Sequence, residues 1–358
     1  MQHTSSRFIL SLLAVALAML GSSAQAADKL TVEDVYKAHR DDNAWFATSE
    51  AKLIIDSVIA HQISSGGWHK QYDLTAGVPD KPQKEWEGGT IDNYATYTEL
   101  ILLAKAYNAT HRRDALASFN KGLDFLLSMQ YPNGGFPQRL PLPKDYGKDI
   151  TFNDHAMTRA LGLLHDVAVN PEYAFVDDAR RTKAKDAFDR GIDIILKLQI
   201  KQDGKLAGWG QQYKADTLEP SKARTYELPS LATDETVGIV RLLMSIEKPS
   251  PEVKTAIKSA VEWLEKSKLT GIRLEKKPDS SLPKGYDVFV VEDSSAPPIW
   301  ARFYEIATNR PSFCGRDGVT KYKLEEIEAE RRSGYAWLRP YAANLPTEYA
   351  KWAKEHGE

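Results

Sequence analysis

Apolar residues recur at spacings of three and four along most of the chain, which is the period of one face of an α-helix. Such stripes cover residues 97–107, 123–130, 161–168 and 192–199. Strand-like alternation is scarce, and its best example is the segment 285–293, which is either one short strand or an extended loop. Helices of this length bury their apolar faces only by packing against other helices. The pattern therefore predicts an all-α protein: an incomplete toroid of helical hairpins with long loops and little strand.

A plan that is repeated along the chain supports this architecture. Each copy ends a helix in glutamine and continues with a glycine turn, an aromatic residue and polar residues, as in 61–72, 129–140 and 198–213. A longer loop follows each copy and ends in an acid at an expected helix start: Asp92, Asp154 and Asp234. A fourth, looser copy ends in Asp293. In a toroid the turns and these loops lie at one end of the hairpins, so we expect the acids to converge there.

The first 26 residues have the pattern of a secretory signal peptide. Arg7 precedes an apolar run over 8–20, and Ala24-Gln25-Ala26 provides small residues at a cleavage site. We expect one domain over 27–358, secreted or periplasmic. The run is too short to span a membrane, and no later stretch approaches the roughly 18 apolar residues that a span requires.

The composition narrows the choice of partners. A formal net charge of -2 suggests neither nucleic acid nor a membrane surface as a partner, so any basic site must be local. Cys314 is the only cysteine, which excludes an intrachain disulfide. We expect a monomer whose stability comes from packing.

The acids at the helix starts have two interpretations. As N-caps, each would accept a hydrogen bond from a free backbone N–H and contribute about 1 kcal/mol. Against this, Thr90 could cap equally well, and the pairs Asp92-Asn93 and Asn153-Asp154 concentrate oxygen ligands at two points. Carboxylates with carboxamides, in the absence of a His or Cys cluster, suit a hard cation such as calcium.

Basic residues form a second group of candidates. Lys222 and Arg224 lie in a loop, away from any amphipathic helix face. We expect a helix within 300–313 that ends in Asn309-Arg310-Pro311, where Arg310 either interacts with the negative end of the helix dipole or binds a ligand. Arginine binds carboxylates through two nitrogens, so calcium and arginines together indicate an acidic ligand. The aromatic residues of the repeated turns either stack on sugars or pack between repeats: Trp68, Phe136 and Trp209.

Five ordered motifs between residues 45 and 340 resemble the catalytic module of family-ten pectate lyases. They are GGTIDNYATYTEL, YPNGGFPQ, ITFNDHAM, KARTYELPSL, and APPIWARFYEIATNRPSFCGRDGVTKY with the downstream EIEAERRSGYAWL. The resemblance implies an (α/α)3 toroid. It also implies calcium-dependent cleavage of polygalacturonate by β-elimination, which gives 4,5-unsaturated oligogalacturonides.

Residue by residue, the resemblance implies that Arg224 is the Brønsted base and that Asp92 and Asp154 bind calcium. The substrate-binding residues that it implies are Asn93, Arg310 and Lys222. An ordinary guanidinium stays charged below pH 12, so the alternative is that Arg224 only stabilises charge while water takes the proton. Departures from the family's usual residues add bulk near the expected cleft: His69, Gln71, Tyr94, Tyr97 and His155.

Two other functions are open on the sequence alone. An inverting glycoside hydrolase on an α/α toroid would use two of the repeated acids as acid and base, but this leaves the basic residues without a role. A catalytically inactive uronate-binding protein would keep the cleft and lack the reaction.

Overall fold

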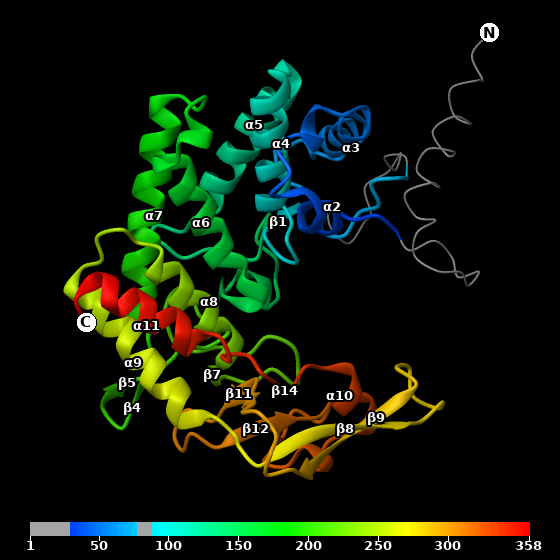
Figure 1. Cartoon of the computed structure of the whole chain (residues 1–358), viewed down its shortest axis with the longest axis vertical. Coiled ribbons are helices and arrows are strands. Elements are labelled where there is room, and N and C mark those ends of the chain that lie inside the picture. Colours follow the sequence, from blue (N-terminus) through cyan, green and yellow to red (C-terminus); the bar gives the residue numbers. More distant parts are fainter. Residues whose placement is uncertain (1–28, 77–87) are drawn as a thin grey trace.

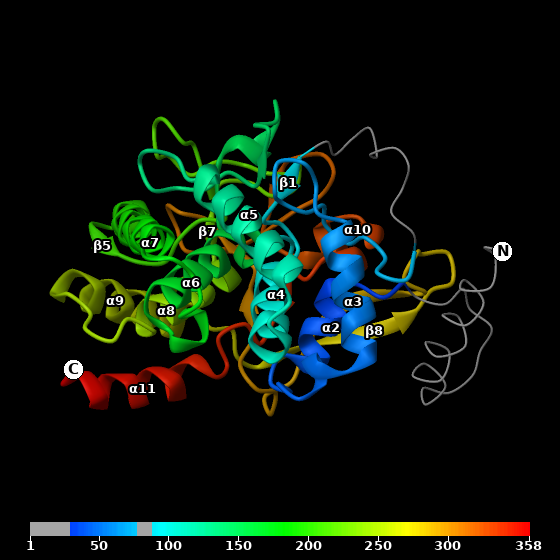
Figure 2. The same ribbon diagram turned by 90° about the horizontal axis from the view of Figure 1, so that it is seen from above.

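Three helical hairpins of similar design form most of the chain that the computed structural model describes, residues 29–76 and 88–358 (Figure 1). The inner helices are α4 (Tyr97–Thr110), α6 (Ala156–Val169) and α8 (Thr233–Met244), and the outer helices are α5 (Arg113–Met129), α7 (Asp178–Leu198) and α9 (Pro251–Ser267). Consecutive inner helices contact one another, as do consecutive outer helices. Seen from above, the hairpins follow one another in chain order (Figure 2). The expected all-α, incomplete toroid is confirmed, while the predicted signal peptide lies outside the described residues.

Further helices cover the two ends of this arrangement. Near the start of the described chain, α2 (Val32–His39) packs on α4, and α3 (Ser49–Ala60) packs on α4 and α5. At the other end, α11 (Leu345–His356) packs against α8 and α9. The short helix α10 (Ala329–Gly334) lies against the strand β9 (Tyr286–Glu292). Single turns of 3-10 helix are Trp45–Ala47, Tyr146–Lys148, Asn153–His155, Pro171–Tyr173 and Leu324–Glu326.

Side-chain caps begin two of the three outer helices. Asp177 accepts a hydrogen bond from the backbone N–H of Arg180 at 3.0 Å at the start of α7. Ser250 caps α9 in the same way through Val253 at 3.3 Å. Each such cap contributes about 1 kcal/mol, so most of the helical stability comes from the buried apolar faces.

The glutamines of the repeated plan join each hairpin to the next. Each donates from Nε2 to a carbonyl of its own turn and to a carbonyl of the following outer helix, at distances of 2.7–3.0 Å. The pairs of acceptors are Gly66 and Ser118 for Gln62, Gly134 and Ala187 for Gln130, and Ala207 and Ala256 for Gln199. The turn must approach the outer helix closely: a Cβ on Gly134, whose φ is +94°, would lie 2.1 Å from a backbone oxygen of α7. The repeated Gln and Gly are therefore structural.

The aromatic residues of the same turns pack between repeats. Trp68, Phe136 and Trp209 are fully buried, which excludes stacking on a sugar. Their backbone carbonyls accept hydrogen bonds at 2.7–3.1 Å from the strands that carry the acidic loops. Each turn thus supports the loop that follows it.

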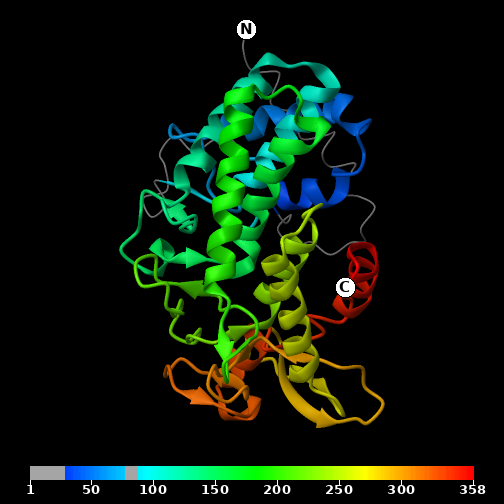
Figure 3. The ribbon, with the colours of Figure 1, turned by 90° about the vertical axis from the view of Figure 1, so that its left-hand side faces the viewer.

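Short strands tie each acidic loop to the following repeat. The pairs are β1 (Gly89–Thr90) with β2 (Arg139–Leu140), β3 (Ile150–Thr151) with β6 (Gln212–Tyr213), and β7 (Leu231–Ala232) with β11 (Phe303–Tyr304). The last pair continues into β12 (Pro311–Cys314) and β13 (Thr320–Lys321). The other pairs are β4 (Lys201–Gln202) with β5 (Lys205–Leu206), β8 (Ile272–Pro278) with β9, and β10 (Trp300–Ala301) with β14 (Leu338–Arg339). The C-terminal strands lie at one end of the helices (Figures 1 and 3).

Two expectations for the C-terminal part are wrong. The segment 300–309 is not a helix, because β10 and β11 pair with β14 and β7. Asp293 does not begin a helix either: it follows β9 and accepts hydrogen bonds from Ser295 in a turn. The strand expected in 285–293 is confirmed as β9. Within residues 29–76 and 88–358, no helix combines the length and apolar character needed to cross a membrane.

Candidate active site

The repeated acids follow β1, β3 and β7 closely: Asp92 lies in a loop, Asp154 in the 3-10 turn Asn153–His155, and Asp234 in the first turn of α8. One backbone hydrogen bond fixes each loop to the next repeat: Ile91 N–H to Gln138 O at 3.0 Å, Phe152 N–H to Gln211 O at 2.9 Å, and Thr233 N–H to Arg302 O at 2.9 Å. These bonds define equivalent positions, namely Asp92, Asn153 and Asp234, followed by Asn93, Asp154 and Glu235. The sequence comparison that treats Asp92, Asp154 and Asp234 as equivalent is therefore wrong by one position at Asp154.

None of the three aspartates is an N-cap. The cap residues of the inner helices are Thr96, His155 and Ala232, and none of them makes a side-chain cap. The backbone φ is positive at Asn93, Tyr94, Thr96, Asp154 and His155. This left-handed conformation costs about 1 kcal/mol or more for each non-glycine residue. Strained loops of this kind are typical of functional sites and do not fit the capping interpretation.

Asp92 offers a buried oxygen that lacks a donor. Its Oδ2 accepts hydrogen bonds from Lys70 Nζ at 2.5 Å and from Asn93 Nδ2 at 3.2 Å. Its Oδ1 is buried and has no hydrogen-bond partner among the residues that the structure describes. A buried carboxylate oxygen without a donor is unfavourable, and a hard cation would satisfy it.

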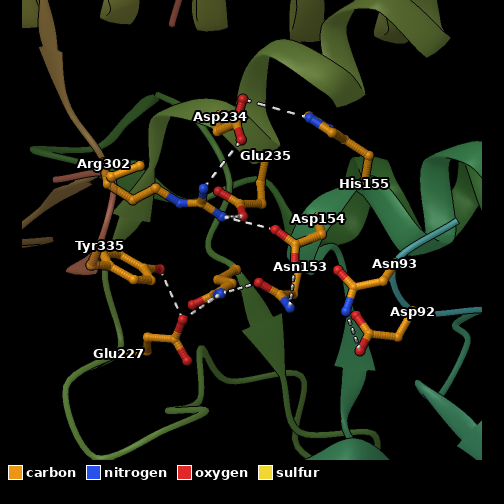
Figure 4. A network of polar contacts seen from close by, with 12 residues as sticks. Asp92, Asn93, Asn153, Asp154, His155, Glu227, Asp234, Glu235, Arg302 and Tyr335 are labelled. Atoms are coloured by element: carbon orange, nitrogen blue, oxygen red, sulfur yellow. Dashed lines mark hydrogen bonds and ion pairs between the residues drawn. The ribbon is translucent and has the colours of Figure 1, made fainter. Parts of the chain in front are cut away.

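Arg302 connects the other acids (Figure 4). Its guanidinium lies 3.2 Å from Asp234 Oδ2 and 3.7 Å from Asp154 Oδ1, and it also binds Glu235. The Arg302 side chain is 8% exposed and that of Glu235 is fully buried, so this ion pair lies out of water. In the view of Figure 4, Arg302 lies on one side of Asp154 and the Asp92-Asn93 pair lies on the other.

Burial and charge shift the pKa values of this cluster. Burial raises the pKa of Glu235 to about 7, against the opposing charge of Arg302. Burial acts in the same direction on Asp234, but His155, 3.5 Å away, and Arg302 hold the pKa of this carboxyl below its ordinary value. Asp234 is therefore the ionised partner of Arg302.

Arg224 is bound to a buried carboxylate. Its Nε and Nη2 donate to Glu227 at 2.7 and 2.5 Å, and the side chain of Glu227 is 1% exposed. Tyr335 donates its O–H to the same carboxylate at 2.8 Å. Gln211 donates to Glu227 at 3.4 Å and also to Asn153, the neighbour of Asp154. A continuous set of hydrogen bonds thus runs from Arg224 to the second acidic loop.

The same pairing keeps Arg224 charged. Burial would lower the pKa of its guanidinium, but the hydrogen bonds and the charge of Glu227 raise it above the ordinary value. Tyr146 connects this side with Asp92: burial raises the pKa of its phenol, Glu227 and Asp92 raise it further, and Arg224 opposes them. Asp92 and Arg224 therefore both influence the pKa of the Tyr146 phenol.

Among the described residues, the remaining basic candidates form none of the hydrogen bonds and ion pairs of this network. Lys222 is exposed on the same loop as Arg224, and within the described residues it forms no ion pair. Arg310 is exposed beyond β11, and its guanidinium stacks 3.5 Å from the ring centre of Tyr322. Arg302, at the opposite end of β11, reaches the acids instead.

The sequence interpretation missed five residues of the network: Gln211, Glu227, Glu235, Arg302 and Tyr335. One signal was available, because Arg302 is a charged residue inside an apolar run and such residues are buried only when they are paired. A second signal was available in Glu227, because this acid lies three positions after Arg224.

The oxygen ligands fit a loosely held hard cation. Among residues 29–76 and 88–358, no group of three or more His, Cys, Asp or Glu side chains is placed to hold a metal ion. Two carboxylates and two carboxamides from the first two acidic loops are the ligands that calcium prefers, with water or an acidic ligand completing the shell. The candidate ligands are Asp92, Asn93, Asn153 and Asp154.

These features define a class: an α/α-toroid protein whose acids and arginines form one network of hydrogen bonds and ion pairs. Comparison with known proteins then gives the family. The model of the pectic acid lyase family matches residues 26–345. No curated protein matches the chain.

Two solved structures of one relative agree with the family match. The family 10 polysaccharide lyase from Cellvibrio cellulosa is 34% identical with a TM-score of 0.75, over 86% of this chain and 95% of that chain. A mutant of that lyase in complex with trigalacturonic acid is 32% identical with a TM-score of 0.75, over 90% of this chain and 99% of that chain. The chain belongs to the pectic acid lyase family and is a polysaccharide lyase. This assignment replaces the glycoside hydrolase interpretation.

Proposed function

We propose that this chain is a calcium-dependent pectate lyase that cleaves polygalacturonate by β-elimination and releases 4,5-unsaturated oligogalacturonides. One observation carries the proposal: Arg224 is joined through Glu227, Gln211 and Asn153 to the loop of Asp154. The relative that was solved with trigalacturonic acid supports a polygalacturonate chain as the substrate.

The acidic loops are suited to hold calcium against a uronate. Asp92 would supply its unpartnered Oδ1, and Asp154 would supply a carboxylate that is 42% exposed. Asn93, bonded to Asp92, would orient the uronate beside them. Calcium bound there would stabilise the negative charge that develops on the substrate carboxylate as the C5 proton leaves.

Arg224 is assigned to the proton at C5. Loss of this proton leaves an electron pair that forms the C4–C5 double bond, and the C4–oxygen bond breaks as the leaving oxygen takes a proton from water. In the described structure the guanidinium is held as a cation by Glu227, so it accepts a proton only after it has lost one. The positive charges of calcium and Arg302 would favour that loss, because like charges disfavour the charged form of an arginine.

The other sequence assignments stay as parts of this proposal. Lys222, exposed two positions before Arg224, would attract uronates that enter the site. Arg310, exposed beyond β11, would bind a uronate of the substrate. The apolar run over 8–20 and the small residues at 24–26 support a mature chain that begins near Ala27 and is exported. We also propose that it acts as a monomer.

Product analysis tests the function. Purified protein is incubated with polygalacturonate and calcium, and both ultraviolet absorbance and reducing ends are followed. β-Elimination produces a conjugated 4,5-unsaturated uronate, so both signals are expected to rise together. Reducing ends without the absorbance would indicate hydrolysis, and binding without either signal would indicate an inactive protein; both results contradict the proposal.

A further inference from the structure

Arg159, in the first turn of α6, contacts both of the loops that carry candidate calcium ligands. Its Nη1 donates to the backbone oxygen of Asp154 at 3.0 Å. Its Nη2 donates to the hydroxyl of Tyr94 at 2.8 Å, and its guanidinium carbon lies 3.8 Å from the centre of the Tyr94 ring. One side chain therefore spans from the second hairpin to the loop of the first.

Both contacts fall on residues with a strained backbone. The φ angle is +69° at Tyr94 and +49° at Asp154. A bulky side chain rarely adopts this conformation, and it persists only where the surroundings hold it. Tyr94 directly follows Asn93 and lies two positions after Asp92. A contact that holds Tyr94 thus also fixes the direction of the adjacent candidate ligands.

The contacts of Arg159 are those of a positioning residue. In the part of the chain that the structure describes, this arginine forms no ion pair, and its hydrogen bonds go to a carbonyl and a phenol. A second cation, Lys37 on α2, lies 5.4 Å from the centre of the Tyr94 ring. The ring is therefore held by contacts from two different helices.

We infer that Arg159, through Tyr94, sets the distance between the Asp92-Asn93 loop and the Asp154 loop and thereby the affinity of the site for calcium. This inference rests on the proposed function. Asp92 and Asp154 come from different hairpins, yet calcium requires its oxygen ligands within a narrow range of about 2.3–2.6 Å. A connection between the two loops reduces the motion that must be frozen when the ion binds.

Two substitutions that keep size or charge test the inference. Arg159→Lys retains the charge but cannot reach both acceptors with a planar group. Tyr94→Phe retains the ring and loses only the hydroxyl. We measure the calcium concentration that gives half-maximal turnover, kcat at saturating calcium, and amide hydrogen exchange of residues 92–96 and 153–156 without calcium.

Arg159→Lys is expected to raise the half-maximal calcium concentration by roughly fivefold, the effect of losing about one hydrogen bond, and to speed exchange in both loops. Tyr94→Phe is expected to act in the same direction by about half as much on a logarithmic scale, because the ring contact remains. In both variants kcat at saturating calcium is expected to stay near that of the wild type. Arg180→Lys is the matched control, since Arg180 joins α7 to Asp124 of α5 across hairpins and is expected to change none of these quantities.

Unchanged calcium dependence together with unchanged exchange would overturn the inference, as would a loss of kcat without a calcium shift. The proposed function fails separately, if the wild type forms no unsaturated product at any calcium concentration. In that case the exchange of the two loops still decides whether Arg159 holds them, and no difference between Arg159→Lys and Arg180→Lys would overturn that role.

Discussion

The guanidinium of Arg224 and the carboxylate of Glu227 form two side-chain hydrogen bonds, at 2.7 and 2.5 Å, and the backbone N–H of Arg224 donates to the same carboxylate at 3.0 Å. Three donors of one residue therefore converge on one buried acid. This arrangement fixes the direction of Arg224 and favours its charged form. The reaction then depends on how readily that pairing is loosened.

Glu227→Gln tests this dependence. Glutamine lacks the negative charge that raises the pKa of Arg224, so that pKa falls. If Arg224 must lose a proton to act, the rising limb of kcat against pH moves to lower pH. The maximal kcat is expected to fall by about tenfold, because Arg224 is held less firmly.

Tyr335→Phe is the matched control for Glu227→Gln. It removes a hydrogen bond to the same carboxylate without removing the charge. We expect its pH profile to keep the position of the wild-type rising limb. A Glu227→Gln profile that coincides with the wild type on the pH axis would show that Arg224 is not the proton acceptor.

Asp154→Asn is expected to raise the calcium requirement of the enzyme. The amide keeps the size of the side chain and one oxygen but removes the charge that attracts the cation. We expect the half-maximal calcium concentration to rise by about tenfold or more, and a chelator to stop the wild-type reaction. Asp124→Asn, at an exposed acid on α5, is the control and should leave the requirement unchanged. Wild-type activity that is indifferent to the chelator would contradict the calcium site.

Arg302→Met is expected to lower the free energy of unfolding. The substitution leaves Glu235 and Asp234 without their guanidinium partner, and the side chain of Glu235 is fully buried. Breaking a buried ion pair in this way costs about 3–5 kcal/mol. Urea unfolding measures the loss, and the double variant with Glu235→Gln should recover part of it. If the single and double variants are equally stable, Glu235 does not depend on Arg302.

Glu99 makes the stability of the protein depend on pH. This residue of α4 is 1% exposed, and burial raises the pKa of its carboxyl from the ordinary 4.5 to about 8. Between these values the native protein holds a proton that the unfolded chain has released. Stability is therefore full below pH 4.5 and falls by about 1.4 kcal/mol per pH unit as the pH rises toward 8.

Urea unfolding of the wild type and of Glu99→Gln at about pH 5 and pH 9 measures this effect. The wild type is expected to lose a few kcal/mol more than the variant between the two conditions, because the amide carries no proton to release. Glu247→Gln, at an exposed position, should behave as the wild type does. An equal loss in all three proteins would show that Glu99 is not protonated in the native state.

The toroid and its turns could be predicted because the residues that produce them are close together in the sequence. Glutamine and glycine recur at each turn, where Gln130, for example, binds both its own turn and α7. The acidic loops were found for the same reason. The equivalence of individual residues between these loops could not be predicted, because carboxylates were aligned with carboxylates regardless of the backbone. The backbone hydrogen bonds of Phe152 and Thr233 show that Asn153, and not Asp154, is the residue equivalent to Asp234.

The rest of the site depends on contacts that are distant in sequence. Residues 300–304 have an apolar pattern that suits a helix as well as a buried strand, and pairing with β7 and β14 decides in favour of strands. This pairing directs Arg302 to acids 67 and 68 positions earlier. Glu227 and Tyr335 meet across 108 positions. No local spacing indicates such partners.

The most direct test is a crystal structure of an Arg224→Lys variant, in which turnover is expected to be lost, with calcium and trigalacturonate. Anomalous scattering locates the ion, for which this account predicts a position between the side chains of Asp92 and Asp154, with a uronate carboxylate bound to it and C5 of that sugar facing residue 224. An ion bound elsewhere, or a sugar whose C5 faces away from residue 224, would contradict the account.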